Sequence, residues 1–155
     1  MKRILTILLL ISACLCAHAQ IAPIQTTEKP YEFIDRMILH WKDKGTYELY
    51  IRSSNQFEKE VVRFQLGNSP EQALESLQNL NALYGQDNME FDLEGRKCGV
   101  HGSRIYVYKR GDLQYAAGDY CIYDFSMKFA IQALEKHISQ LQAVEKTAND
   151  DSSHD

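Results

Sequence analysis

Three tyrosines, Tyr106, Tyr108 and Tyr115, have the spacing in this 155-residue chain that most favours binding. Between the last two lies Gly111-Asp112, a residue pair typical of a tight two-residue hairpin turn. A reversal there would set Tyr108 opposite Tyr115, with Tyr106 on the same side of the sheet. Tyrosine offers a large amphipathic surface at low entropic cost, so we predict a binding face for a ligand or partner. The alternative is an aromatic cluster that shields a solvent-facing sheet.

Two cysteines, Cys98 and Cys121, form a candidate disulfide. A hairpin turn at Gly102-Ser103 would place Cys98 beside Val107, which in turn would lie beside Ala116. Cys121 is then five residues further along the strand, about 16 Å away, whereas a disulfide needs α-carbons within about 7 Å. The sequence therefore leaves two alternatives open, a bridge made through a bulge or two buried free thiols.

A metal site has weak support in the sequence. Cys98-Gly99-Val100-His101 has a short Cys-x-x-His spacing, and Cys121 and His137 would complete four zinc ligands on paper. Structural zinc sites usually pair their ligands at both ends, however, and here only one end is paired. Cys98 and His101 also make a poor nucleophile–base pair, because residues three apart on a strand face opposite sides. We predict no metal and no cofactor.

Motifs for catalysis are equally scarce. Glu90, Asp92 and Glu94 share one face of a predicted strand, which we interpret as solvated rather than as acid–base machinery. The chain has no phosphate-binding glycine loop, no nucleophile elbow and no zinc-protease helix motif. The sequence thus favours a binding protein over an enzyme, with a small hydrolase as the alternative.

The predicted tyrosine face depends on a four-strand antiparallel meander over Met89 to Tyr123. Three turn candidates, Glu94-Gly95, Gly102-Ser103 and Gly111-Asp112, divide this stretch at short intervals. Ile105 and Val107 would then face the core, and the tyrosines would lie outside.

Two helices accompany the strands. The first is predicted over Pro70–Tyr84, with Ser69 as N-cap, Gln72 as its capping-box partner and Gly85 at its end. The second is predicted over Ser126–Val144, with an apolar stripe that should be buried. This stripe comprises Phe129, Ala130, Ala133, Leu134, Ile138, Leu141 and Val144.

The first half of the chain contains strands predicted at Thr46–Arg52 and Glu60–Leu66. Residues 31–42 fit both helical and strand spacing, and we favour a strand because Asp43-Lys44-Gly45 makes a good hairpin connection. The chain is therefore predicted to be α+β, in the order β-β(-β)-α-β-β-β-β-α. Its mostly antiparallel sheet should carry both helices on one face.

The N-terminus resembles a bacterial signal peptide over residues 1–19, with a basic start, an apolar run and Ala17-His18-Ala19 before the cleavage point. An alternative is a lipoprotein anchored at Cys14. We expect a flexible leader at 20–30, one domain at 31–146 and a disordered acidic tail at 147–155. The apolar run of this N-terminus is too short to cross a bilayer as a helix, and no other segment comes near the length that is needed.

The function predicted from sequence is an exported, non-enzymatic module that binds an unidentified ligand or protein of the cell envelope, in the periplasm or outside the cell. With 17 basic and 21 acidic residues and no basic cluster, the chain is a poor nucleic-acid binder. Besides the hydrolase, a further alternative is an assembly subunit that pairs through an edge strand such as Thr46–Arg52.

Overall fold

The structure, a computed structural model, describes residues 29–53, 59–86, 88–108 and 120–151. The predicted signal peptide, most of the predicted leader, the Gly111-Asp112 turn and Tyr115 lie outside the described residues. Predictions that concern them therefore stay predictions.

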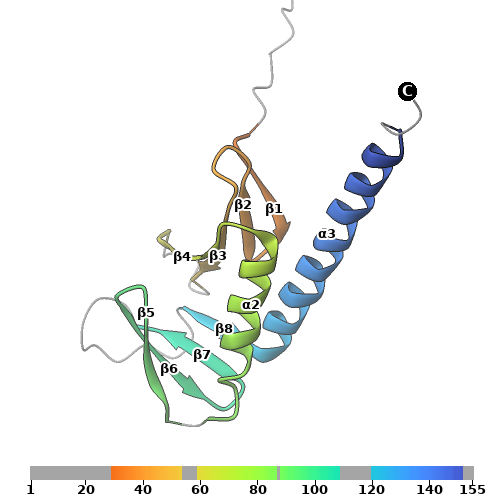
Figure 1. The fold of residues 1–155 in the computed structure, drawn as a ribbon. Helices are drawn as coiled ribbons and strands as arrows, with labels where there is room; N and C mark the ends of the chain where they lie inside the picture. The colour runs from red at the N-terminus through yellow and green to blue at the C-terminus, as the bar shows by residue number, and fades with distance from the viewer. Residues whose placement is uncertain (1–28, 54–58, 87, 109–119, 152–155) are drawn as a thin grey trace, which may run out of the picture.

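The described residues form two antiparallel meanders, each followed by a helix (Figure 1). The first sheet has the order β1-β2-β3-β4 and precedes helix α2, and the second has the order β5-β6-β7-β8 and precedes helix α3. The predicted α+β class, antiparallel pairing and element order are confirmed, and the strands are divided between two four-stranded sheets. The strands are β1 (Tyr31–Asp35), β2 (Ile38–Trp41), β3 (Thr46–Arg52), β4 (Val61–Gly67), β5 (Glu90–Leu93), β6 (Arg96–His101), β7 (Arg104–Val107) and β8 (Cys121–Tyr123), and the helices are α2 (Pro70–Asn81) and α3 (Asp124–Asp151).

A single core joins the two sheets and both helices. Helix α2 packs on β4 and against α3, while α3 also contacts β1 and β8. Period-two patterning gives β3 and β4 one buried face each. Ile38 pairs with Leu49 and Leu49 with Phe64, and all three are at most 2% exposed.

The ambiguous stretch at 31–42 is extended, as favoured, but it consists of two strands rather than one. The chain reverses at Arg36 and Met37, and β1 carries an irregularity between Phe33 and Asp35. Because β2 and β4 flank β3, Thr46–Arg52 lies inside the first sheet, so its prediction as an edge strand is wrong.

The second meander follows the predicted register across β5, β6 and β7. The register between β7 and β8 differs from the prediction: Tyr106 pairs with Cys121 and the Val107 N–H donates to the Tyr120 carbonyl, whereas a two-residue turn at Gly111-Asp112 would have set Val107 beside Ala116. Glu94 and Gly95 both have positive φ, 50° and 76°, as a tight hairpin turn with left-handed residues requires. Cys98 pairs with Val107 as predicted. Val107 and Ile105 are fully buried.

Helix α2 has the predicted N-terminus, because Ser69 Oγ accepts a hydrogen bond from the Gln72 N–H at 3.2 Å. The Gln72 side chain reaches one residue further back than a capping box, accepting from the Asn68 N–H at 3.0 Å. The helix ends at Asn81, with turns before Gly85 (φ +85°).

Helix α3 departs from its predicted burial. Met127, Ala130 and Leu134 are fully buried, whereas Phe129 and Val144 are 59% and 68% exposed and Leu141 is also exposed. The predicted stripe is therefore wrong at these three positions, because Phe129 lies off the buried face and the distal turns of α3 diverge from the first sheet (Figure 1). The helix continues through Asp151, and residues 152–155 lie outside the described part. Neither described helix is long and apolar enough to cross a membrane.

Candidate binding groove and histidine cluster

The two predicted bridge partners, Cys98 and Cys121, are free thiols. Cys98 on β6 pairs with Val107, and Cys121 on β8 pairs with Tyr106, so β7 separates them. Two strand spacings amount to roughly 9–10 Å, beyond the reach of a disulfide. Adjacent positions on β7 also face opposite sides of the sheet. The structure thus contradicts the disulfide and leaves the alternative of two free thiols. The four zinc ligands considered in the sequence, which included both cysteines, are not brought together.

The predicted tyrosine face is described at two of its three positions. Tyr106 and Tyr108 lie half-buried on the side of β7 opposite the core, and Tyr115 lies outside the described residues. The Tyr106 hydroxyl accepts from Arg104 Nη1 at 3.4 Å. The Tyr108 ring lies over Gly99, where an added Cβ would meet its hydroxyl at 3.0 Å. Lys97 Nζ lies 5.5 Å from the Tyr108 ring centroid. The binding role of this face stays a prediction.

The acidic strand face is exposed, as predicted. Glu90 forms an ion pair with Lys97 at 2.8 Å, and the Asp92 side chain accepts from the Gly95 N–H at 2.8 Å. Glu94 accepts from the Gln65 N–H at 3.0 Å and so links the second sheet to β4. These carboxylates serve as structural acceptors.

A groove of about 580 Å³ lies between the end of β3 and the short strand β8. Three consecutive residues from each strand line it, 50–52 and 121–123. Side chains of consecutive strand residues point to opposite faces, so three in a row can line one groove only along a strand edge. The remaining walls are Phe33, Arg36 and Met37.

Strand β8 presents to this groove a backbone edge that no other described strand pairs with. The Val107 N–H donates to the Tyr120 carbonyl and the Asp124 N–H to the Ser103 carbonyl, so even-numbered residues of this segment bond toward β7. By the alternation of an antiparallel ladder, the N–H and C=O groups of Cys121 and Tyr123 point the other way. Among the described strands, only β7 pairs with β8.

Strand β3 loses its β2 neighbour at the same groove. The β2–β3 pairing extends only to Ile38 opposite Leu49, followed by one bond from the Tyr50 N–H to the Met37 carbonyl at 2.8 Å. Ile51 and Arg52 then pair with β4 alone among the described strands. Two incomplete sheet edges thus border one groove.

Hydrogen bonds from the buried Tyr120 and the half-buried Tyr84 hold β8 in place beside β3. The Tyr120 hydroxyl donates to the Glu60 carbonyl just before β4, and the Tyr84 hydroxyl donates to the Ile122 carbonyl, each at 3.1 Å. Burial, followed by the charge of Asp124, raises the pKa of Tyr84, which keeps this hydroxyl a donor. These hydrogen bonds therefore fix the position of the β8 edge before any segment binds to it.

The groove walls combine aromatic surface with positive charge. Arg36 and Arg52 are exposed, and no carboxylate residue is among the described lining residues. Arg52 donates to the Tyr50 hydroxyl at 3.3 Å, and its guanidinium lies 5.4 Å from that ring.

An aromatic face on the first sheet continues outward from the groove. Phe33 packs on Tyr50 at 5.2 Å, and Tyr31 packs on Trp41 at 5.4 Å. The Arg63 guanidinium lies 5.7 Å from the Tyr50 ring and 6.0 Å from the Trp41 ring. Sequence reasoning missed this face because residues 31–42 were ambiguous, although the alternation of Tyr31 and Phe33 was a signal for it.

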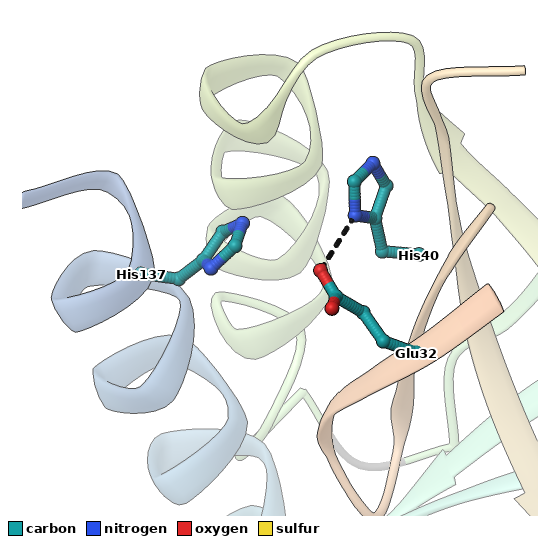
Figure 2. Close-up of side chains that lie close together, drawn as sticks. All are labelled: Glu32, His40 and His137. Atoms are coloured by element: carbon teal, nitrogen blue, oxygen red, sulfur yellow. Dashed lines mark hydrogen bonds and ion pairs between the residues drawn. The ribbon is translucent and has the colours of Figure 1, made fainter. Parts of the chain in front are cut away.

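A second cluster lies on the inner side of the first sheet, where Glu32, His40 and His137 converge from β1, β2 and α3 (Figure 2). His40 Nδ1 lies 3.1 Å from Glu32 Oε1, and Lys42 Nζ lies 3.1 Å from Glu32 Oε2. The His40 ring stacks on Tyr47 with centroids 4.4 Å apart, and the Tyr47 hydroxyl lies 3.4 Å from His137 Nε2.

The electrostatics of this cluster follow from its contacts. The hydrogen bond from His40, aided by Lys42, lowers the pKa of Glu32. Burial, followed by the charge of His40, lowers the pKa of His137. Burial, followed by the charges of Glu32 and Glu71, raises the pKa of Tyr47. The arrangement therefore favours the ionised carboxylate of Glu32 and the neutral imidazole of His137.

Of these residues, only His137 was singled out from the sequence, and then with different partners. Glu32 and His40 meet because they are direct cross-strand partners in β1 and β2. Comparisons of this chain with protein-family models, with curated proteins and with solved structures gave no match.

Proposed function

We propose that this protein is an exported binding module that accepts an extended segment of a partner polypeptide in the groove between β3 and β8. Export rests on the signal-like pattern of residues 1–19. The observation that carries the proposal is the lining of one groove by three consecutive residues from each of two incomplete strand edges.

Strand addition explains why such an edge is useful for binding. A segment laid along β8 would pair with the N–H and C=O groups of Cys121 and Tyr123, and main-chain hydrogen bonds of this kind give affinity with little sequence demand. Selectivity then comes from alternate side chains of the segment, which would reach the groove walls.

The walls indicate the chemistry of the segment. Phe33, Met37 and Tyr123 offer apolar contact, and Arg36 and Arg52 favour carboxylates without an opposing acidic wall among the described residues. Charged rims of this kind steer association and select partners. We infer a segment that alternates apolar with acidic residues.

The proposal joins two alternatives predicted from sequence, a binding module and a subunit that pairs through a strand edge. The edge belongs mainly to β8 rather than to the whole of Thr46–Arg52. Tyr106 pairs with Cys121, so the predicted tyrosine face borders the groove and can extend the contact.

The test selects 12-residue peptides from a display library against untagged protein of residues 20–155, in EDTA. Enriched peptides should alternate apolar with acidic residues. The selected peptide is then made in two N-methylated phases, one with the backbone nitrogens of its odd-numbered residues methylated and one with those of its even-numbered residues. Only the phase whose methylated nitrogens face β8 should lose binding. Equal binding of both N-methylated peptides would contradict strand addition, and loss of binding in both phases alike would contradict pairing with β8 alone.

Variants locate the site. Arg36→Glu with Arg52→Glu should weaken the selected peptide at least about tenfold, which corresponds to roughly 1.4 kcal/mol. Arg96→Glu, outside the groove, is the matched control and should bind like the original protein. A loss with Tyr106→Ser but not with the groove variant would place binding on the tyrosine face instead.

A further inference from the structure

We propose that Glu32, His40 and His137 form a binding site for a zinc ion. Their candidate ligand atoms lie within 4.8 Å of one another, although α3 lies almost a hundred residues after β1 and β2 along the chain. All three side chains are half-buried, and Figure 2 shows them directed toward a common point from two strands and a helix. This proposal is independent of the peptide groove.

The donor set suits zinc. Two imidazoles and one carboxylate are the three protein ligands of many zinc sites with an open fourth position. Ligands at about 2.0–2.1 Å from a tetrahedral zinc lie roughly 3.3–3.4 Å apart. His40 Nδ1 and Glu32 Oε1, 3.1 Å apart, are already close to this separation. A small movement of the His137 side chain would complete the set.

Neighbouring side chains orient each ligand, as the surroundings of metal sites commonly do. Lys42 holds Glu32 Oε2 at 3.1 Å, which leaves Oε1 available as a single donor. Tyr47 stacks on the His40 ring at an interplanar angle of 8°, and its hydroxyl contacts His137 Nε2. The ring of one ligand and the position of another are thereby constrained by the same tyrosine.

A cavity of about 480 Å³ gives access to the cluster. Glu32 and His137 both line it, together with Lys136 and Gln140 on α3. An ion held between Glu32 and His137 would be reached from this cavity, and water would fill its fourth position.

The test uses untagged protein of residues 20–155, stripped with EDTA and dialysed at pH 7.5. Titration calorimetry with ZnCl₂ should show one strong site, and Co²⁺ should give the visible absorption of a tetrahedral nitrogen- and oxygen-ligated ion. His40→Ala and His137→Ala should each weaken zinc binding by roughly tenfold or more, because each removes one of three protein ligands.

His101→Ala, on the exposed side of β6, is the matched control and should leave the zinc affinity unchanged. Circular dichroism checks that each variant is folded, and Tyr47→Phe adds a milder change that should weaken zinc binding less than loss of a ligand. Absence of zinc binding, or zinc binding that is lost in His101→Ala but kept in His137→Ala, would overturn the site. Peptide binding is measured in EDTA, so either proposal can fail alone.

Discussion

At the residue scale, the two cysteines show how burial decides reactivity. Cys98 is fully buried on the core face of β6, and burial, followed by the charge of Asp92, raises its pKa to about 12. Because the thiolate is the reactive form, Cys98 should be inert near neutral pH. Cys121 is half-buried and lines the groove, so solvent and reagents reach it.

We therefore expect one reactive thiol in the native protein. With Ellman's reagent at pH 8, protein of residues 20–155 should release one equivalent of chromophore when folded and two in guanidinium chloride, without prior reduction. Cys121→Ser should abolish the native reaction while leaving one thiol after unfolding. Rapid reaction of the folded Cys121→Ser variant, or no free thiol after unfolding, would contradict the structure.

The same residues show where local reasoning reached its limit. The Gly102-Ser103 turn was sufficient to predict that Cys98 lies beside Val107, because a glycine-containing turn fixes the register of both strands. The hairpin between β1 and β2 turns at Arg36 and Met37, and neither is a favoured turn residue. Without that turn, the sequence could not pair Glu32 with His40, and the histidine cluster was missed.

At the element scale, α2 is the helix whose local signals all agreed, and its start depends on one side chain. Ser69 caps the Gln72 N–H, and Pro70 occupies the first helical position. Ser69→Ala should lower the free energy of unfolding by about 1 kcal/mol, measured by urea denaturation.

Ser139→Ala is the matched control for this change. Ser139 lies within α3, where its hydroxyl donates to the Glu135 carbonyl one turn earlier, an interaction that does not stabilise a helix. The control should be neutral or slightly stabilising, in line with the higher helix propensity of alanine. Equal destabilisation by both substitutions would mean that the cap contributes nothing specific.

Helix α3 shows why a correct helix can have a wrong buried face. Its apolar residues cover more than one side, so periodicity alone admitted a stripe that included Phe129 and Val144. Burial depends on what the fold places beside each turn, and only the turns around Met127, Ala130 and Leu134 meet the core. The existence of the helix was local information, whereas its extent through Asp151, beyond the predicted end at Val144, and its packed surface were not.

At the scale of the whole molecule, two meander–helix units share one core. Their class and order could be predicted, because hairpin turns and helix caps are encoded over a few residues. The division of the strands into two sheets depends on which distant edges meet, and local signals do not specify that. The groove between β3 and β8 is a product of this division, since β3 has lost its β2 partner there and β8 pairs only with β7 among the described strands.

The lowered pKa values of His137 and Glu32 make the free energy of unfolding depend on pH. The pKa of His137 is lowered from 6.5 and that of Glu32 from 4.5, so at acidic pH the unfolded chain binds more protons than the native state at both groups. The free energy of unfolding should therefore fall as pH drops below about 6.5, and further below about 4.5. His40, Tyr47 and Glu32 are the groups that face His137.

Replacing His137 should reduce the fall in the free energy of unfolding between pH 7.5 and 5.5. In EDTA, urea midpoints of the His137→Gln variant should change less between pH 7.5 and 5.5 than those of the original protein, because the burial and His40 charge that oppose protonation then act on no titratable group. His101→Gln, on the exposed side of β6, should keep the original slope. Parallel pH profiles for His137→Gln and the original protein would show that this imidazole does not couple folding to pH, and a steeper profile would reverse the sign argued here.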